Sequence, residues 1–322
     1  MALLYCSSYG QDLHYSQFFN SPLNVNPALA GAFGGEQRIT ANYKNQWNSS
    51  LVPYNEFTMA YDRKISPSDT TGFFSVGGHL NYDKAGDLGF QLINVGLSGS
   101  YALKMTRNSY LSPGIQIGLN SRNYNQGAAT TGNQFDGESF DPGISPEALP
   151  DDSKLFVDIS AGVNYRRQVT YRDYINAGVS VYHLLAPDQA YFSQQSSSNL
   201  DRRISVYGMG SFEILNNLDI LGNALYSVQG GDHQEIVLNA QGKIYLNKNK
   251  ERNIALYLGL GTRLSDSWYP MIAFQYKNYY GSFSYDITTS DLGSDKGNGP
   301  EFAFRYLFYN VPLAPFKPCP IY

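Results

Sequence analysis

The sequence has few cysteines, few tryptophans, few charged residues and no long hydrophobic run. Of its 322 residues only 2 are Cys and 2 are Trp, and Cys6 and Cys319 lie near opposite ends, so no disulfide framework is predicted. No apolar run approaches the roughly 18 residues that a transmembrane helix needs. Charged residues make up 16% of the chain, and the net charge of −4 offers no basic patch for nucleic acid.

Motifs of catalytic and metal sites are also missing. The four histidines, His14, His79, His183 and His233, are scattered and show no metal-ligand spacing. No serine lies in a GxSxG pattern. The run GLGTR at 259–263 contains glycines, but no helix is predicted after it, so it is not a phosphate-binding loop. We therefore predict no enzyme activity, no cofactor and no metal.

Short two-faced segments are what the sequence does contain. The clearest is 253–263, in which Ile254, Leu256, Leu258 and Leu260 share one parity while small or polar residues occupy the other. A period of two predicts a β-strand with one apolar face and one polar face. Because the pattern recurs with no long helix to cover the apolar faces, the chain is predicted to close into a transmembrane β-barrel, which is apolar outside.

From Gln37 onward, alternation and turn signals predict an all-β, antiparallel barrel of about fourteen strands. In the fourth strand the apolar parity changes between Leu92 and Ile93, which predicts a β-bulge there. The expected strands span residues 37–47, 52–63, 71–82, 88–105, 109–122, 154–168, 171–183, 201–213, 216–229, 234–246, 251–265, 267–277, 279–287 and 299–309.

The long connections, residues 123–153, 184–200 and 288–298, all follow odd-numbered strands. Outer-membrane barrels have short periplasmic turns and longer outside loops, so this parity predicts that both chain termini lie in the periplasm. The first of these loops carries six acidic residues and no Lys or Arg. Such a cluster would suit a calcium ion, but it matches no EF-hand pattern, and we expect a solvated acidic loop.

Four regions are expected along the chain. Residues 1–10 resemble the tail of a secretory signal peptide without its basic start, although a disordered N-terminus is the alternative. Residues 11–36 form a pre-barrel segment whose prolines and glycines exclude a regular element. Its apolar side chains require burial, so we expect it to pack against the barrel wall or mouth. The barrel itself spans 37–309, and a periplasmic tail occupies 310–322.

The inward-facing positions of the predicted strands carry both charge signs. A lining of one sign would favour an ion-selective pore, whereas a mixed lining can form cross-strand ion pairs that hold a plug or close the lumen. A channel for small solutes therefore stays open as an alternative. The charged and polar inward positions are Arg38, Lys44, Glu56, Asp62, Gln116, Arg122, Asp158, Arg166, Arg203, Glu213, Glu235, Lys243, Arg263, Lys277, Glu301 and Arg305.

Aromatic residues near the strand ends are typical of the girdles that barrels place at the two membrane interfaces. A large soluble β-sandwich would bury many of the same residues and is the rival fold. The expected girdle residues are Tyr43, Trp47, Tyr61, Tyr165, Tyr182, Trp268 and Tyr276.

Four runs of the sequence carry a resemblance to a known family. The most specific is SQFFNSPLNVNPALAG at 16–31, and the others are RITANYKNQW at 38–47, PYNEFTMAYDRKI at 53–65 and the ending KPCPIY at 317–322. These runs resemble the PorP/SprF family of Bacteroidetes outer-membrane proteins. The resemblance implies a fourteen-stranded transmembrane barrel, associated with the type IX secretion system and gliding motility.

By this resemblance, the protein takes part in protein secretion or cell-surface anchoring. The implied partners are outer-membrane lipid, a secreted cargo or adhesin bound through its C-terminal domain, and periplasmic components of the secretion ring or motor. Seven residues of the first run are expected to form a plug or a wall contact, with a loosely ordered leader as the alternative. They are Phe18, Phe19, Pro22, Leu23, Asn26, Pro27 and Gly31.

Overall fold

The structure is a computed structural model, and part of the chain is described in it. The described residues are 12–46, 54–68, 71–86, 88–128, 130–141, 143–144, 147, 153–190, 198–231, 233–247, 254–289 and 298–309. The signal-peptide prediction for 1–10, the tail at 310–322, and Trp47 lie outside this part. In the described part, no helix is both long and apolar enough to cross a membrane.

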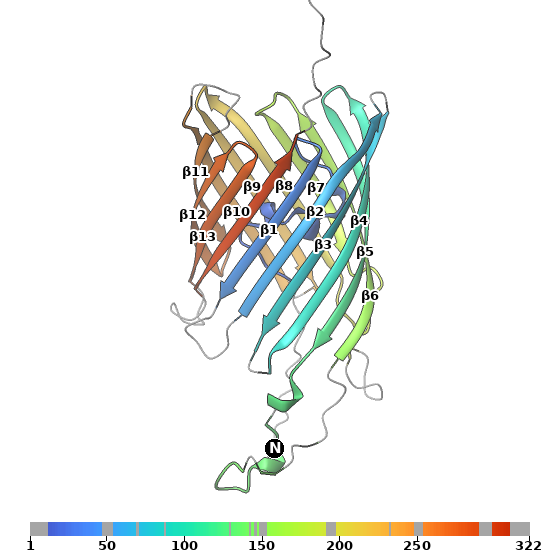
Figure 1. Cartoon of the computed structure of the whole chain (residues 1–322), viewed down its shortest axis with the longest axis vertical. Coiled ribbons are helices and arrows are strands. Elements are labelled where there is room, and N and C mark those ends of the chain that lie inside the picture. Colours follow the sequence, from blue (N-terminus) through green and yellow to red (C-terminus); the bar gives the residue numbers. More distant parts are fainter. Residues whose placement is uncertain are drawn as a thin grey trace, which may run out of the picture.

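Fourteen antiparallel strands form a closed barrel (Figure 1). Each strand pairs with its neighbours in the sequence, and β14 pairs with β1 through a register that joins Gln37 to Phe308. The predicted fold class and strand number are therefore confirmed. The strands are β1 (Gln37–Gln46), β2 (Tyr54–Ser68), β3 (Gly72–Ala85), β4 (Phe90–Thr106), β5 (Ser109–Asn123), β6 (Ser153–Gln168), β7 (Tyr174–Tyr182), β8 (Arg203–Leu215), β9 (Leu218–Gln229), β10 (His233–Tyr245), β11 (Ile254–Arg263), β12 (Ser267–Tyr276), β13 (Tyr279–Thr288) and β14 (Gly299–Phe308).

The two faces of the strands differ as the alternation predicts. In β5, Ile115 and Ile117 point outward and are 53% and 56% exposed, whereas Gln116 between them is 6% exposed and faces the lumen. The same alternation holds for Leu258 and Leu260 of β11, which are both exposed on the outside. An apolar outer surface has a favourable environment only in lipid, so the barrel is suited to a membrane.

The β-bulge predicted in the fourth strand is wrong. The pairing of β4 with β3 runs without a shift from Phe90 to Leu103, straight through Leu92 and Ile93. Ile93 continues the outward parity of β4, and Leu92 is an apolar residue on the inward parity close to the end of the strand. The irregularity of β4 lies at its other end, where the pairing with β5 shifts after Lys104.

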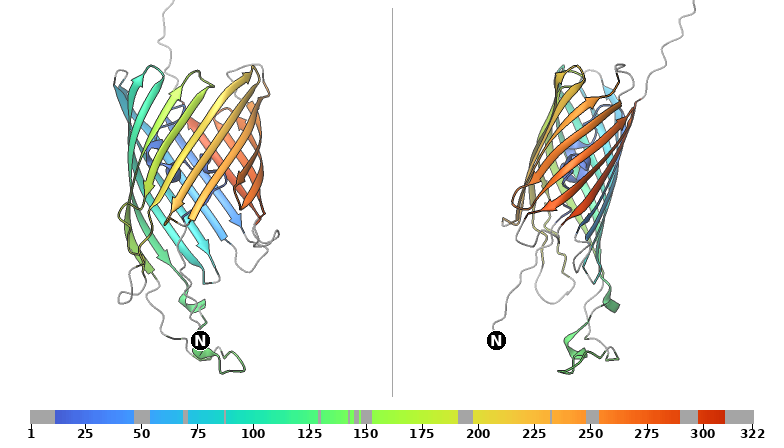
Figure 2. Two further views of the ribbon diagram at one scale, coloured as in Figure 1. Left: turned by 180° about the vertical axis from the view of Figure 1, so that it is seen from behind. Right: turned by 90° about the vertical axis from the view of Figure 1, so that its left-hand side faces the viewer.

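The two ends of the barrel carry different connections. The connection of 29 residues between β5 and β6 and that of 20 residues between β7 and β8 lie at one end, the long-loop end, together with the β13–β14 connection. Two-residue turns at 107–108, 216–217 and 277–278 lie at the other, the short-turn end. At the long-loop end, β4 to β6 extend beyond their neighbours (Figures 1 and 2), consistent with their lengths of 15 to 17 residues.

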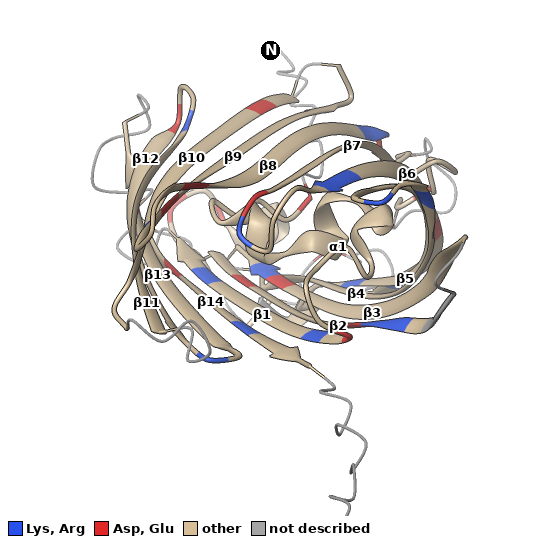
Figure 3. Cartoon of the chain, turned by 90° about the horizontal axis from the view of Figure 1, so that it is seen from above, with Lys and Arg blue, Asp and Glu red and all other residues tan. Residues whose placement is uncertain are grey.

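Residues 12–36, here called the lumenal segment, lie inside the barrel. They contain η1 (Phe18–Asn20), α1 (Pro22–Val25) and η2 (Pro27–Leu29), and Figure 3 shows α1 within the ring of strands. Two further short 3₁₀ turns, η3 (Gln126–Ala128) and η4 (Gly132–Gln134), lie in the β5–β6 loop. Prolines open both α1 and η2, where the missing N–H of proline has no partner to lose.

The lumenal segment runs along the barrel from one end to the other. Asp12, the first described residue, contacts His183 directly after β7 at the long-loop end. At the other end of the segment, Glu36 donates its backbone N–H to Phe308 at the short-turn end, where β1 starts. The last described residue, Tyr309, follows β14 at that same end. The described chain therefore begins at the long-loop end and ends at the short-turn end. The chain termini themselves lie outside the described residues, and their location in the periplasm stays a prediction.

Candidate functional site

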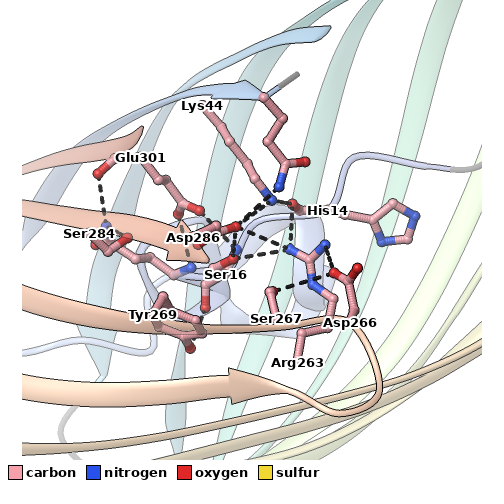
Figure 4. Close-up of polar contacts among 12 residues, drawn as sticks. His14, Ser16, Lys44, Arg263, Asp266, Ser267, Tyr269, Ser284, Asp286 and Glu301 are labelled. Carbon is pink, nitrogen blue, oxygen red and sulfur yellow. Dashed lines mark hydrogen bonds and ion pairs between the residues drawn. The ribbon is translucent and has the colours of Figure 1, made fainter. Parts of the chain in front are cut away.

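The lumenal segment and the wall that holds it form the candidate site. Near the long-loop end the Glu301 carboxylate accepts hydrogen bonds from two consecutive backbone N–H groups, those of Ser16 and Gln17, each at 2.9 Å (Figure 4). The Ser16 hydroxyl donates to Asp286 at 2.6 Å, and the Tyr269 hydroxyl donates to the Ser16 carbonyl at 2.8 Å. Strands β12 and β14 therefore satisfy backbone groups that have no secondary-structure partner, and β13 accepts the Ser16 hydroxyl.

Lys44 and Arg263 supply the counter-charges to these carboxylates. The Lys44 ammonium lies 3.2 Å from Asp286, with both side chains fully buried, and donates to the His14 carbonyl at 2.6 Å. Arg263 lies 3.2 Å from Glu235 and also donates to the His14 carbonyl, at 3.3 Å. Because charges buried without partners are costly, these ion pairs are needed once the segment excludes water from this part of the lumen.

Asp12 enters a second charged cluster at the long-loop end. His183 lies 2.8 Å from Asp158 through Nδ1 and 2.8 Å from Asp12 through Nε2, and Arg203 lies 3.2 Å from Asp12. Burial opposes the imidazolium, but the charge of Asp12 and hydrogen bonds to both carboxylates raise the pKa of His183 to about 9. Burial likewise opposes the carboxylate of Asp12, yet the charges of His183 and Arg203 hold its pKa well below the usual range.

Asn26 fixes the middle of the segment. Its side-chain amide donates to the carbonyls of Val163 and Val179, each at 3.1 Å, and to the Tyr207 hydroxyl at 3.2 Å. Its side-chain oxygen accepts from the Ala28 N–H at 2.8 Å and caps η2. One buried residue thus joins the segment to β6, β7 and β8.

Apolar side chains fill the space between these polar anchors. Phe18, Val25 and Leu29 form a buried cluster with wall residues Tyr207, Val237 and Tyr269, and Leu23 packs with Ala30 and the wall residue Ala60. Each fully buried large apolar side chain contributes roughly 1.5–3 kcal/mol. The apolar wall residues in this region therefore serve to pack against the segment, because a water-filled lumen would carry polar residues at these positions.

Two glycines permit the close approach of segment and wall. At Gly114 of β5, a Cβ atom would lie 2.5 Å from the backbone of Ala28. Gly31 has φ of 74°, and a Cβ there would lie 2.0 Å from the Ser75 hydroxyl. Neither position has room for a larger side chain without displacement of the segment.

At the short-turn end, the wall holds the segment largely through its backbone carbonyls. Arg38 forms a buried ion pair with Asp62 at 2.8 Å and donates to the Leu29 carbonyl at 3.1 Å. The Lys64 ammonium donates to the Phe33 carbonyl at 2.6 Å, and the Arg166 guanidinium donates to the Ala32 carbonyl at 3.1 Å. The segment is thus tied to the wall over its whole described length.

All seven residues selected in the first sequence run lie in the lumen. Phe18, Pro22, Leu23, Asn26, Pro27 and Gly31 are buried, and Phe19 is partly buried against the aromatic residues of β11 and β13. Sequence reasoning did not select Asp12, His14, Ser16 or Gln17, whose contacts anchor the start of the segment. The signal that could have indicated them was the mixed charge of the inward strand positions, because buried charges need partners inside the barrel.

The predicted girdle residues divide into two groups. Tyr43, Tyr61, Tyr165, Trp268 and Tyr276 are exposed on the outer face, all but Tyr61 within a few residues of a strand end, and their role at the membrane interface stays a prediction.

Tyr182, by contrast, was assigned wrongly to the girdle. It is 4% exposed, faces the lumen and donates its hydroxyl to the Leu23 carbonyl at 2.7 Å. As the last residue of β7 it has the inward parity of Ser180, which donates to the Val25 carbonyl.

Titratable groups in the described part of the chain do not assemble a metal site, since no three His, Cys, Asp or Glu side chains there are grouped to hold an ion. In the β5–β6 loop, Asp136 and Asp141 instead accept backbone N–H groups of their own turns, from Glu138, Ser139 and Gly143. The site is thus a lumenal segment held in place by polar contacts with the barrel wall.

Comparison with known families agrees with this architecture. Residues 7–306 match the family described as type IX secretion system membrane protein PorP/SprF. The chain belongs to the PorP/SprF family. No curated protein matches it.

Among solved structures, this PorP/SprF barrel is similar to a FadL homologue of Pseudomonas aeruginosa, with a TM-score of 0.53, 11% identity and coverage of 88% of this chain and 93% of that one. It is also similar to the toluene transporter TbuX of Ralstonia pickettii, with a TM-score of 0.51, 12% identity and coverage of 90% and 94%. At such identities the likeness concerns the fold alone, which is that of an outer-membrane β-barrel.

Proposed function

We propose that this outer-membrane barrel docks or anchors a secreted cell-surface protein, or links that protein to the type IX machinery, and does not conduct solutes. The observation that carries the proposal is the lumen, which the chain's own residues 12–36 traverse from the long-loop end to the short-turn end. Polar anchors at Glu301, Asn26 and Arg38 hold them along the way. In a barrel whose lumen is occupied in this way, the loops and turns at the two ends are the surfaces that partners can bind.

The long-loop end supplies the surface for a secreted partner. Because β4 to β6 extend beyond their neighbours, the described part of the β5–β6 loop projects well beyond the strand ends (Figure 2). This loop exposes Phe135, Phe140 and Ile144 to solvent, next to the carboxylates of Asp136 and Asp141. Exposed apolar residues among charges are typical of protein interaction sites. By the general rule for outer-membrane barrels, this end faces the outside of the cell.

Co-purification tests the proposal. The tagged chain is isolated from detergent-solubilised outer membranes, and the proteins recovered with it are identified by mass spectrometry. A large secreted protein, bound through its C-terminal domain, is the expected result, and periplasmic ring components would place the barrel in the export machine. Recovery should fall when Phe135 and Phe140 are both replaced by Ser. The control Leu264→Ser, at an exposed apolar residue of a short connection at the same end, should retain it.

A barrel that purifies without partners and conducts steadily in a planar bilayer would contradict the proposal and support a solute channel.

A further inference from the structure

A cavity of about 290 Å³ lies at the short-turn end, between the end of the lumenal segment and the wall. Residues 30–34 of the segment form one side, and β2 to β6 form the other. The turn at Arg107 and Asn108 contributes to its rim, so the cavity is reached from the short-turn end. Its volume is just below the usual range of small-molecule sites, which begins at about 300 Å³.

Three cations line this cavity. They are Lys64 of β2, Arg107 of the β4–β5 turn and Arg166 of β6, and none of the described residues that line the cavity is acidic. None of the three forms an ion pair with a described carboxylate. By contrast, Arg38 nearby is paired with Asp62 and does not line the cavity. The lining of the cavity thus gathers three positive charges, while the carboxylates of Asp62 and Glu36 act on Lys64 from outside the lining.

Neutral groups hold two of these cations in place. The Lys64 ammonium, besides its hydrogen bond to the Phe33 carbonyl, lies 5.0 Å from the centre of the Phe33 ring and 5.4 Å from that of Phe73. Arg166 donates to the Ala32 carbonyl and to the Gln168 side chain. Carbonyls and ring faces orient a cation but leave its charge in place, so the site is preorganised for an anion.

We propose that this cavity binds a small ligand through a phosphate group. Two guanidinium groups and an ammonium provide several N–H donors, and arginine pairs with phosphate oxygens through two parallel hydrogen bonds. Phe33, Phe73 and Tyr110 form the apolar part of the lining, against which the rest of the ligand packs. The phosphate comes either from a soluble compound at the short-turn side or from the headgroup of an anionic lipid that reaches over the rim at Arg107.

Binding at this site also acts on the lumenal segment. Lys64 and Arg166 donate to the carbonyls of Phe33 and Ala32, and a bound phosphate shares these same donors. Phosphate binding therefore changes the hydrogen bonding of residues 31–34, where the segment leaves the lumen and continues into β1.

Calorimetric titration of the purified full chain in a phosphate-free, non-ionic detergent provides the test, with inorganic phosphate as the probe and chloride at matched ionic strength as the reference. The intact protein should show saturable binding of phosphate but not of chloride. Arg166→Gln and Arg107→Gln should each weaken it about tenfold, since each removes charge-assisted hydrogen bonds. Arg167→Gln removes the same charge from the neighbouring, outward-facing position of β6 and should leave binding unchanged.

Two further measurements complete the test. In nanodiscs, loss of the phosphate titration when an anionic phospholipid replaces a zwitterionic one identifies the lipid headgroup as the source, and an unchanged titration identifies a soluble compound. Amide exchange at residues 31–34 should change with phosphate in the intact chain, and Arg107→Gln should need about tenfold more phosphate for the same change. Because Arg107 lies in an exposed turn, Arg107→Gln can be used for the test if Arg166→Gln does not fold. Equal response to phosphate and chloride, or equal affinity in Arg107→Gln, Arg167→Gln and the intact chain, would overturn the proposal.

Discussion

Asn26 illustrates, at the scale of single residues, how the lumenal segment is held. Strand carbonyls that already pair within the barrel gain a second donor from its amide, and its oxygen caps η2 at the same time. The position demands one residue type, because only a side-chain amide of this length offers two donors and an acceptor.

The variant Asn26→Ala should destabilise the packed segment. It leaves the buried Ala28 N–H without its acceptor and removes the donors to Val163 and Val179, at an expected cost of about 1–3 kcal/mol. The effect is measured by thermal unfolding in detergent, in which protease cleavage of the segment reports its release. Asn217→Ala in the exposed β8–β9 turn is the control and should change stability by less than about 0.5 kcal/mol. Equal stability of the two variants would contradict the role given to Asn26.

His183 makes the hold on Asp12 depend on pH. Its folded pKa of about 9 lies above the unfolded value of 6.5, so its contribution is fully present below about pH 6.5 and is lost as the pH rises through about 9. The shift corresponds to at most about 3 kcal/mol. Asp158 and Asp12 are the charged groups in contact with it, and Arg203 pairs with Asp12.

Protease access to the start of the lumenal segment should therefore increase between pH 7 and pH 10 in the intact protein. His183→Gln keeps a hydrogen-bonding side chain but cannot carry the charge, so its protease access should already be raised at pH 7 and should vary little with pH. A pH dependence that persists unchanged in His183→Gln would assign the effect to another group.

At the scale of elements, strands and lumenal segment differ in how much of them the sequence predicts. The strands were predictable, to within a few residues at most ends, because lipid on one side and the lumen on the other impose a strict period of two. Leu258 and Leu260 of β11 show it directly. Tyr182 has the inward parity of its strand, but its aromatic ring at a strand end suggested the girdle, and only its contact with Leu23 shows otherwise.

The path of the lumenal segment could not be predicted in the same way. It has no periodicity, and its partners are far away in sequence, as Ser16 and Glu301 show. Burial of its apolar residues was expected from composition. The direction in which the segment runs along the barrel axis, however, depends on which polar groups of the wall need partners. Asp12 meets His183 and Arg203 only after the barrel has closed.

Gly114 offers a test at this scale. In Gly114→Val the new side chain would overlap with the backbone of Ala28, which is already 2.5 Å from the position of a Cβ atom. Overpacking of this kind costs about 1–3 kcal/mol, and we expect α1 and η2 to move away from β5. Amide exchange of residues 22–31 should rise, while exchange in the strands stays low. The control Gly99→Ala, on the outer face of β4 with open space around it, should leave both unchanged.

At the scale of the whole molecule, the barrel is asymmetric along its axis. The described chain begins at the long-loop end, fills the lumen, and reaches the wall at the short-turn end. Paired carboxylates and cations occur at both ends, as with Asp286 and Lys44 at the first and Asp62 and Arg38 at the second. The second end also has the cavity, which is lined by cations without a described ion-pair partner. Loops, lumen and cavity are thus three separate features of one PorP/SprF barrel, and only the first is expected to meet a secreted partner.

Planar-bilayer recording tests most directly the central claim that the chain's own N-terminal residues close the lumen. The intact protein is compared with a variant that lacks residues 12–30, after both have been shown to run as folded barrels. The intact barrel should be electrically silent, and the deletion variant should show steady conductance, because the removed residues occupy the path through the lumen. Steady conductance of the intact protein, or equal silence of the folded deletion variant, would contradict this account.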